Sequence, residues 1–548
     1  MDKSFTSFSD IPISDGKSFK DLLTFHGKNY WWYNDTNIYE DLLKRNLDEF
    51  TNVKAIHFFV AKYFKFLLCI VDIITYIMIL IVEVFSQKKH CTESNNINPL
   101  ALLKTSARRW IIEQDQKSHE CKVNGMYYDE ILENFNDKLS IITLFTDIPT
   151  IFAFKRYLKV KMYYLYPSIA LTRYWSWNVW VEEKNATIYF KEVFDKIKNN
   201  DDWWMQASEL TGLPISDLKK ILEYHLYCTF PLCVRHNILM ENVVKRENPS
   251  VMILTGEQAY MGRGWIYVGK KYQIPVIGLQ HGVIHPDDPG YMMHNRYTDM
   301  EINSPHPFPL PDLTLVWGQK DYELLVNEAG YPKEKIIVTG NPRNDRLVVH
   351  SDSDIKERIF TEYNIPKSHK MILWTTQSHA NTKNENDLYF SEVFSAVSQI
   401  DNITLIVKPH PHEGDLAEKL VKKYSIQYDR VNVHVAANSN DTTAMIMACD
   451  LLLIKNSTTG QEAVALQKPL VVLDFSDEFD KGHYVEEEVA IGVTEENKLT
   501  DTLNTLFNDD SLLKSSRDAY IEKYMYKIDG LSAKRCADII TSLISKDT

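Results

Sequence analysis

Short apolar runs alternate with longer amphipathic stretches along most of the chain. Between residues 96 and 345 the runs "SVMILTG", "IPVIGLQHG" and "LTLVWG" are separated by segments with helical periodicity. A second series begins at "MILWTTQ", continues through "ITLIVKPHP" and "DLLLIKNSTTG", and ends in predicted helices. Apolar strands that alternate with helices predict a parallel sheet covered on both faces. The pattern therefore predicts two doubly wound, Rossmann-like α/β domains, 96–345 and 369–548, joined by a linker at 346–368.

The first 95 residues follow a different pattern and are predicted to form a helical N-terminal extension. An aromatic cluster, "YWWY" at 30–33, is typical of a packed corner, with a membrane-interface belt as the alternative. The apolar segment Phe66–Val82 has lysines on both sides and is at the short end for a spanning helix. Asp72 near its middle counts against a simple span. We expect residues 55–86 to contact a membrane, by spanning it or lying on it, and burial within the protein is the alternative.

Composition limits the kind of protein and its partners. A chain of 548 residues with 44% apolar and 25% charged residues is typical of a folded protein of more than one domain. The net charge of −13 argues against a nucleic-acid partner. The 7 cysteines are scattered and never in CxxC spacing, which favours a reducing compartment. The polar first residues resemble no signal peptide, so we expect a cytoplasmic protein at the inner face of the membrane.

Most polar clusters in the two predicted domains directly follow a strand. Loops at the carboxyl ends of parallel strands are where such folds bind ligands, so we expect these loops to line a cleft between the domains. Glu257 or His281 could take a proton from an acceptor hydroxyl there. A structural role is the alternative for His285. The remaining residues expected on the acceptor side of the cleft are Gln280, Gly282, Asn341 and Arg343.

The motif "NSTTGQE" opens a predicted helix in the second domain. Small hydroxyl residues and a glycine at such a position let backbone N–H groups and the helix dipole face an anion. The residues predicted to hold a diphosphate and a ribose are Ser457, Thr458, Thr459, Gly460 and Glu462. An ordinary helix N-cap is the alternative, because Ser or Thr followed by Glu is what helix starts favour.

The motif "KPHPHEG", 408–414, follows another predicted strand of this domain. Its prolines stiffen the loop, and Lys408 with His410 suits the stabilisation of a departing phosphate. Thr376 and Gln377, in "TTQSH", follow a neighbouring strand and are also predicted donor contacts. The histidines lack HExxH or two-His-carboxylate spacing, so we expect no metal. GxSxG, Walker A and GxGxxG motifs are likewise absent from the sequence.

Four motifs together carry a family resemblance: "QHG" (280–282), "VTGNPRND" (338–345), "KPHP" (408–411) and "NSTTGQEA" (456–463). In this order they resemble GT-B glycosyltransferases of the surface-carbohydrate and capsular-polysaccharide type. These include Kdo-transferring capsule enzymes and, more distantly, polyol-phosphate polymerases that use CDP-glycerol. The resemblance covers roughly residues 100–525.

The resemblance implies a GT-B fold, in which two Rossmann-like domains face a cleft. "KPHP" resembles the HP motif that families with CMP-activated donors place against the nucleotide phosphate. The donor contacts that the resemblance implies are Lys408, His410, Pro411, Ser457, Thr458, Thr459 and Glu462. Gln280 and His281 would face them across the cleft.

"VTGNPRND" is also similar to the non-hydrolysing UDP-N-acetylglucosamine 2-epimerases, which share the GT-B fold. Those enzymes usually carry an HRREN-like stretch and a "DSGG" loop. This chain has "TTQSHANTKNE" and "NSTTG" instead.

We therefore expect a metal-independent glycosyltransferase that moves a sugar from a CMP- or UDP-linked donor to a glycan or lipid-linked acceptor in surface polysaccharide synthesis. The nucleotide-sugar is a substrate, and no cofactor is expected. The catalytic candidates are Glu257, His281 and His410. The alternatives are a CDP-polyol phosphotransferase, a UDP-sugar 2-epimerase, and a catalytically silent GT-B module that binds glycan or acts as a scaffold.

Overall fold

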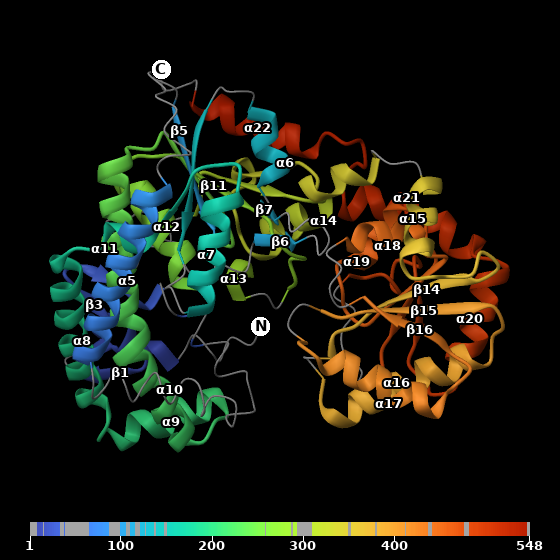
Figure 1. Cartoon of the computed structure of the whole chain (residues 1–548). Helices are drawn as coiled ribbons and strands as arrows, with labels where there is room; N and C mark the ends of the chain where they lie inside the picture. Colours follow the sequence, from blue (N-terminus) through green and yellow to red (C-terminus); the bar gives the residue numbers. More distant parts are fainter. Residues whose placement is uncertain are drawn as a thin grey trace. The chain divides into compact units, whose positions relative to one another are not determined.

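The computed structural model divides the chain into two compact units (Figure 1). The first unit comprises residues 1–315, 322–337 and 537–548, and the second comprises 316–321 and 338–536. Within them the structure describes residues 8–14, 16–32, 35, 38, 65–86, 99–105, 110–114, 121–125, 128–135, 139–146, 151–257, 259–286, 289–292, 310–348, 352–378, 381–410, 413–436, 441–475 and 482–544.

A seven-stranded sheet forms the centre of the first unit, in the order β13-β12-β11-β10-β5-β8-β9. The strands are β5 (Leu100–Thr105), β8 (Ser140–Phe145), β9 (Ser168–Ala170), β10 (Val251–Thr255), β11 (Val276–Leu279), β12 (Leu313–Val316) and β13 (Ile336–Val338). The pairings from β9 through β12 are parallel. Numbered along the chain, the order is 3-2-1-4-5-6-7, so it reverses between β5 and β10. Ligands of open α/β sheets bind at such a switch point.

Long helices cover this sheet and extend the unit. They are α7 (Ile151–Tyr163), α8 (Trp177–Ile197), α9 (Asp201–Thr211), α10 (Ile215–Tyr224), α11 (Phe230–Glu247) and α12 (Ala259–Lys271). Figure 1 shows α8 and α11 packed side by side. Gly264 allows α12 to approach α11 closely, because a methyl group there would lie 2.5 Å from Asn237 Oδ1. A separate antiparallel pair, β6 (Trp110–Gln114) and β7 (Cys121–Gly125), was not predicted.

The N-terminal segment packs into the first unit. It contains β1 (Pro12–Ser14), β2 (Lys17–Ser18), α2 (Phe19–Leu22), β3 (Thr24–Phe25) and β4 (Lys28–Asn29). The Trp31 ring lies 5.6 Å from that of Phe8, and the Trp203 ring lies 5.4 Å from that of Phe19. Arg263 of α12 donates to the Trp32 carbonyl and pairs with Asp35 in a fully buried contact. The predicted packed corner is confirmed for the described residues of "YWWY".

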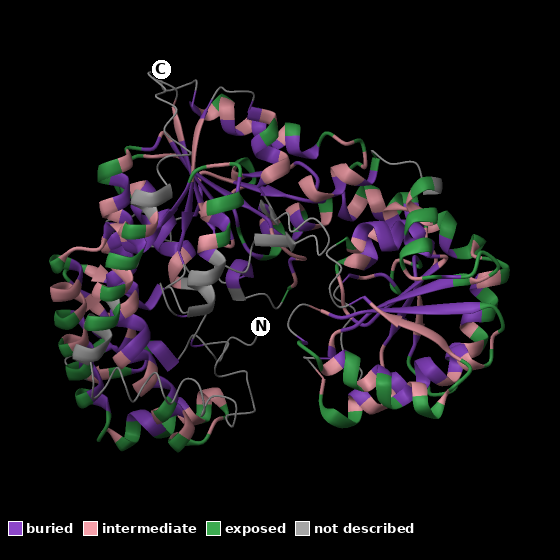
Figure 2. Ribbon diagram, in the orientation of Figure 1, coloured by how far each residue is buried: buried purple, intermediate pink, exposed green. Residues whose placement is uncertain are grey.

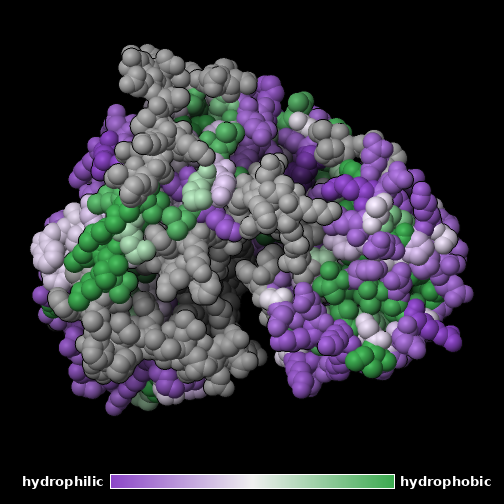
Figure 3. All heavy atoms as spheres, in the orientation of Figure 1, coloured by the Kyte–Doolittle hydropathy of each residue, from purple (hydrophilic) through white to green (hydrophobic). Residues whose placement is uncertain are grey.

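Helix α5 (Lys65–Ser86) lies against the first unit with one side only. Ile79 on that side is fully buried, and the Tyr76 ring lies 5.8 Å from that of Trp175. The other side carries an apolar stripe, which Figure 3 shows as a continuous hydrophobic band. The stripe consists of Ile70, Val71, Ile74, Ile77, Met78 and Ile81, exposed by 37–53%. Among the helices that the structure describes, none combines the length and apolarity that crossing a membrane requires.

The second unit contains a six-stranded sheet whose pairings are all parallel. Its strands are β14 (Lys370–Thr375), β15 (Ile403–Lys408), β16 (Asn432–Val435), β17 (Leu451–Ile454), β18 (Leu470–Leu473) and β19 (Ile491–Val493). Its helices are α15 (Asp352–Glu362), α16 (Lys383–Ser398), α17 (Leu416–Gln427), α18 (Thr442–Ala448), α19 (Thr459–Ala465), α20 (Leu499–Asn508) and α21 (Ser511–Tyr524). The order β16-β15-β14-β17-β18-β19 is 3-2-1-4-5-6 along the chain and reverses between β14 and β17.

Successive side chains of β14 face opposite cores of this unit. Met371 and Leu373 pack in one apolar cluster, whereas Ile372 and Trp374 pack in the other. Because both faces are covered, the strand is apolar from Met371 to Trp374. Figure 2 shows β14 and β15 buried along their length.

Two doubly wound domains are confirmed, with differences at the edges. The short strands β9 and β19 were not predicted. The predicted linker 346–368 contains α15, whose Ile359 and Phe360 belong to the core of the second unit. The last helix, α22 (Ser532–Ile544), ends among residues assigned to the first unit.

Candidate functional site

One side chain joins the two loops at the switch point of the second unit. The Gln377 carboxamide donates to the backbone oxygen of Asn456 at 2.7 Å and accepts from the backbone N–H of Asn456 at 2.8 Å. Gln377 follows β14 and Asn456 follows β17, where the strand order reverses. The two hydrogen bonds therefore extend the pairing of β14 with β17 beyond the ends of these strands, and they hold the two loops together.

A buried carboxylate connects the β14 loop to the loop after β15. Glu413 is 6% exposed and accepts from Thr376 Oγ1 and from the Ser378 N–H, both at 2.8 Å. Lys408, the last residue of β15, is also buried, and its Nζ donates to the Pro409 carbonyl at 3.1 Å. Burial lowers the pKa of Lys408, although the charge of Glu413 opposes this. Glu413 was not predicted as a site residue. Its position in "KPHPHEG", close to the predicted Lys408 and His410, was the only indication of its role in the sequence.

Hydroxyl groups from β14 and α19 meet at the same edge. Thr459 Oγ1 donates to Ser457 Oγ at 2.8 Å and lies 3.1 Å from Thr375 Oγ1. The backbone N–H groups of Gly460 and Gln461 bond the carbonyls of Ser457 and Thr458, both at 3.1 Å. The first-turn N–H groups are therefore already paired, unlike the open anion cradle that the sequence predicted.

Gly460 is required by a close contact at the start of α19. A methyl group at this position would lie 2.5 Å from the Tyr484 ring. The Tyr484 hydroxyl donates to the Ser457 carbonyl at 2.9 Å. The Tyr484 ring thus packs against the loop after β17, and only glycine fits beside the ring at position 460.

Glu462, the predicted ribose contact, has partners in the second unit. Its Oε2 accepts from Thr443 Oγ1 at 2.6 Å, and its Oε1 lies 3.4 Å from an Arg346 nitrogen. These bonds orient the carboxylate and leave it partly exposed. A ribose contact stays a prediction.

Two residues predicted for the acceptor side belong to the second unit instead. Asn341 and Arg343 lie at the start of η10 (Pro342–Val348), where Asn341 Oδ1 accepts from the Arg343 N–H at 3.1 Å. Asp345 of the same motif accepts from the backbone N–H groups of Ser532 and Ala533. The "TGNPRND" motif therefore anchors the start of α22.

The remaining donor residues lie in or near the same loops. The half-buried His410 follows β15, and its carbonyl accepts from the Glu413 N–H at 2.9 Å. Thr458 is exposed beside Ser457. Pro411 and its neighbour His412 lie outside the described residues. The structure thus brings Thr376, Gln377, Lys408, Ser457 and Thr459 to one edge of one sheet.

Glu257 lies at the switch point of the first unit, directly after β10. It is 4% exposed, and it accepts from Thr314 Oγ1 at 2.6 Å and from the Tyr331 hydroxyl at 3.4 Å. Burial raises the pKa of Glu257 to about 7, although the two hydroxyls and Lys335 oppose the shift. Gly278 makes room for this carboxylate, because a methyl group there would lie 2.0 Å from Glu257 Oε1.

The other first-unit candidates follow β11. The His281 ring lies against Gly256, at which a methyl group would be 3.4 Å from Cε1. Gln280 is buried and donates to the Gly282 carbonyl at 2.9 Å. His285 is half-buried in the same loop. His281 therefore lies against the residue that precedes Glu257, and the acceptor-side roles of Gln280, Gly282 and His285 stay predictions.

Metal binding has no support in the part of the chain that the structure describes. Those residues contain no group of three or more His, Cys, Asp or Glu placed to hold a metal ion. Metal independence stays a prediction.

Comparisons with known proteins bear on the fold and on the second unit. A family model described as UDP-N-acetylglucosamine 2-epimerase matches residues 310–541. The S. aureus MnaA structure with UDP is 15% identical, with a TM-score of 0.50, and the match covers 82% of this chain and 97% of that one. The Neisseria meningitidis UDP-GlcNAc 2-epimerase bound to UDP-GlcNAc is 13% identical, with a TM-score of 0.50, covering 81% and 100%. These two structures establish the architecture.

The chain has a GT-B fold. The predicted fold class is confirmed. The wall teichoic acid polymerase TagF is matched over 87% of this chain and 97% of its own, at 13% identity and a TM-score of 0.45, a likeness too weak to support a conclusion. No curated protein sequence matches the chain. Among the activities left open for this GT-B protein, UDP-sugar 2-epimerisation agrees better with the family model than glycosyl transfer does, and a Kdo- or CDP-glycerol-type specificity stays a prediction.

The raised pKa of Glu257 predicts a pH-dependent cost to stability. Between pH 4.5, the ordinary pKa of a glutamate side chain, and about 7, the folded protein holds a proton that the unfolded chain has lost. The free energy of unfolding should therefore fall as pH rises through this window, by about 3 kcal/mol in total. Glu257→Gln removes the titrating group. The free energy of unfolding of this variant, measured relative to that of the wild type, should therefore rise by a similar amount across the same pH window.

Urea denaturation at intervals from pH 4.5 to 7.5 measures this difference. Glu192→Gln, at an exposed position of α8, is the matched control and should follow the wild type. A Glu257→Gln curve parallel to the wild-type curve at every pH would show that the carboxyl group is not shifted.

Proposed function

We propose that the chain binds a pyrimidine nucleotide-sugar at the carboxyl edge of the six-stranded sheet and epimerises the sugar at carbon 2. The observation that carries the proposal is the overlap between the family model and this edge. The match over residues 310–541 includes every loop that Gln377, Glu413 and Asn456 connect. The geometry gives this overlap a physical basis, because the edge lies at a switch point.

The edge offers contacts suited to a diphosphate. The Lys408 ammonium is buried, and its hydrogen bond in the described part of the chain goes to a neutral carbonyl. A phosphate would add to the negative charge of Glu413 that already acts on this buried cation. The hydroxyls of Ser457 and Thr459 can reorient to donate to phosphate oxygens. Because the backbone N–H groups of α19 are engaged, we assign phosphate binding to these side chains.

Epimerisation at carbon 2 needs no acceptor substrate. Removal of the carbon-2 proton would form a C1=C2 double bond as the C1–O bond to the nucleotide diphosphate breaks, and re-addition of the diphosphate at carbon 1 would accompany return of a proton to the opposite face of carbon 2. An imidazole is the side chain best suited to exchange a proton near neutral pH. We assign this role to His410, which is on the β15 loop beside Lys408. Glu257 and His281 stay predicted catalytic residues.

Glycosyl transfer to a glycan or lipid-linked acceptor is the second candidate. The loop "NSTTG" favours it, because the resembling epimerases usually carry "DSGG" there. Transfer would use the same nucleotide contacts and would place the enzyme in surface polysaccharide synthesis. The two candidates differ in whether turnover requires an acceptor.

The apolar stripe of α5 supports membrane contact, and we propose that it lies on an anionic membrane surface. A helix with one face packed on protein and one face apolar suits the interface plane rather than a span. Lys62, Lys65, Lys88 and Lys89 flank the stripe in sequence and would add attraction to anionic lipid. This would place the protein at the inner face of the membrane.

Nucleotide binding should depend on the charge of Lys408. UDP should raise the melting temperature, as ligand linkage requires. Lys408→Met should weaken UDP about 10- to 100-fold, because a charge-assisted contact contributes about 1.5–3 kcal/mol, while leaving the binding of uridine unchanged. Titration calorimetry with UDP, CMP and uridine measures this. Lys419→Met, at an exposed site of α17, is the control; equal UDP affinity in both variants would contradict the assignment.

Turnover should occur with UDP-N-acetylglucosamine alone. In deuterated water the protein should form the 2-epimer with deuterium at carbon 2, observed by proton NMR. His410→Asn should slow this at least about 100-fold, as loss of an acid–base group does, and should still bind UDP. UDP release that occurs only when a glycan or lipid-linked acceptor is added would favour transfer. Binding of UDP without either reaction would refute both activities.

Membrane binding should require the apolar stripe. Full-length protein should co-sediment with vesicles of mixed neutral and anionic lipid, and less with neutral vesicles or in high salt. The double variant Ile74→Glu/Ile77→Glu should bind at least about tenfold more weakly, because it places two charges in the face that would insert into the membrane. Ile188→Glu, at an equally exposed position of α8, is the control. Unchanged binding by the double variant, or a stripe-dependent dimer in solution without vesicle binding, would exclude this surface as the membrane contact.

A further inference from the structure

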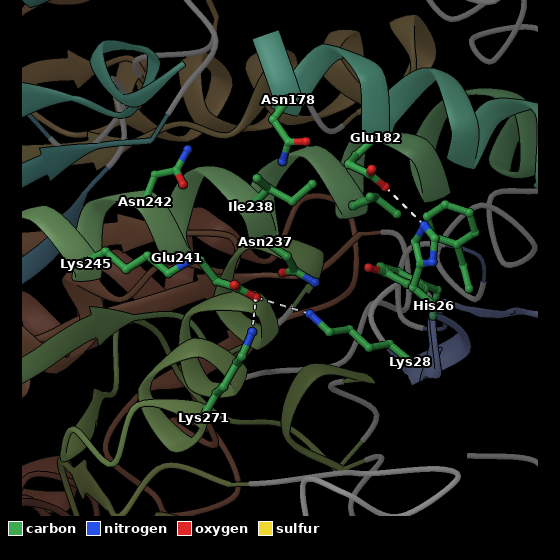
Figure 4. A pocket seen from close by; sticks show the side chains of 13 residues that line it. His26, Lys28, Asn178, Glu182, Asn237, Ile238, Glu241, Asn242, Lys245 and Lys271 are labelled. Carbon is green, nitrogen blue, oxygen red and sulfur yellow. Dashed lines mark hydrogen bonds and ion pairs between the residues drawn. The ribbon is translucent and has the colours of Figure 1, made fainter. Parts of the chain in front are cut away.

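A pocket of about 250 Å³ opens in the first unit among helices that the proposed reaction does not use. Its walls come from the N-terminal β3–β4 segment, from α8 and α11, and from the last residue of α12. Figure 4 shows side chains from these elements pointing toward one another across it. The N-terminal segment completes the pocket, which gives that segment a use beyond packing.

The pocket lies at the opposite edge of the sheet from Glu257. Helix α12 begins just after β10 and ends at Lys271, shortly before β11 starts at Val276. A helix that connects parallel strands runs back to their amino ends. Lys271 is therefore at the amino edge, as is Lys245, which lies near the end of α11 and shortly before β10. The pocket is thus separate from the carboxyl-edge residues.

The acidic side chains of the pocket already have partners on neighbouring elements. Glu241 accepts from Lys271 at 2.8 Å and from Lys28 at 3.2 Å. Burial raises the pKa of Glu241, but the two ammonium groups outweigh it and lower the pKa overall. His26 lies 3.1 Å from Glu182. The carboxylates are therefore fixed parts of the wall, available to accept bonds from a ligand hydroxyl.

Three polar groups of the pocket have no charged partner in the described part of the chain. Lys245 Nζ forms no ion pair or hydrogen bond there, and neither does the Asn178 carboxamide. The Asn237 side chain is 1% exposed; its carboxamide interacts with the Tyr30 hydroxyl, and its remaining hydrogen-bonding capacity is unused among the described residues. Unused hydrogen-bonding capacity of a buried carboxamide costs about 1–3 kcal/mol, which a ligand's polar groups would recover.

These groups define the chemistry of a ligand. The Lys245 ammonium is exposed at the pocket and can pair with one negative charge of a ligand, and carboxamides both donate to and accept from hydroxyls. Phe25 and Tyr30 add apolar ring surface to the lining. The volume is below the range of about 300–1,000 Å³ for drug-sized ligands, so it suits a single ring. We propose that this pocket binds one sugar residue that carries a negatively charged group, a carboxylate or a phosphate.

Lys245 would pair with the charged group in this arrangement, and Asn178 and Asn237 would bind ring hydroxyls. The proposal does not rest on the reaction at the other edge. It gives the protein a second carbohydrate site, distinct from the one that takes the nucleotide-sugar.

Calorimetry and saturation-transfer NMR on the full-length protein without nucleotide would test this. The probes are glucuronate and glucose 6-phosphate. Glucose is the uncharged control, and inorganic phosphate is the control that carries the charge but no sugar ring. At least one anionic sugar should bind about tenfold more tightly than glucose and than phosphate, because both the charge and the hydroxyls contribute. The stronger of the two identifies the charged group.

Variants locate the site. Lys245→Met should weaken the anionic sugar about tenfold, to the level of glucose, and Asn178→Ala should weaken both sugars. Lys196→Met, at an exposed position of α8, is the control and should change neither. UDP affinity should be the same in all three variants. Failure of the anionic-sugar proposal can therefore be distinguished from failure of the proposed nucleotide site. Absence of sugar binding by the wild type, or anionic-sugar affinity unchanged by Lys245→Met, would overturn the proposal.

Discussion

The paired hydrogen bonds between the Gln377 carboxamide and the backbone of Asn456 are the constraint on which the candidate nucleotide site depends. They hold two loops together where the strand order of the second unit reverses. Glu413 does the same for the neighbouring loop by bonding Thr376 and the Ser378 N–H. Every group that we assign to phosphate binding is attached to one of these three loops. Their positions are therefore set before a ligand arrives, which lowers the entropy cost of binding.

The first unit repeats the topology with different chemistry at its switch point. There a single buried carboxyl group, Glu257, occupies space that exists only because residue 278 is glycine. Its pKa of about 7 makes it a group that changes charge near neutral pH. The second unit instead presents hydroxyls and one buried ammonium. The two switch points thus offer different chemistry on one topology, because the side chains after the strands differ.

Periodicity predicted the two sheets and the loops at their carboxyl ends, since a parallel sheet buried on both faces has few sequence alternatives. The contacts among those loops could not be predicted. Glu413 and Thr376 lie far apart in sequence, and nothing in "KPHPHEG" indicates which strand its carboxylate faces. The buried pair of Arg263 with Asp35 was likewise not predicted, because the two residues are more than 200 positions apart in the sequence. Asn341 and Arg343 were assigned to the first domain because its predicted end was set after their motif, at 345, whereas the division between the units directly precedes the motif, at 337/338.

Hydrogen–deuterium exchange with and without UDP tests the central claim most directly, because it locates the nucleotide without assuming an activity. Backbone amides of 375–378 and 455–462 should exchange more slowly with UDP bound, and those of the Lys245 pocket at the amino edge of the first unit should not change. Protection confined to the first unit, with these two loops unchanged at saturating UDP, would contradict the account.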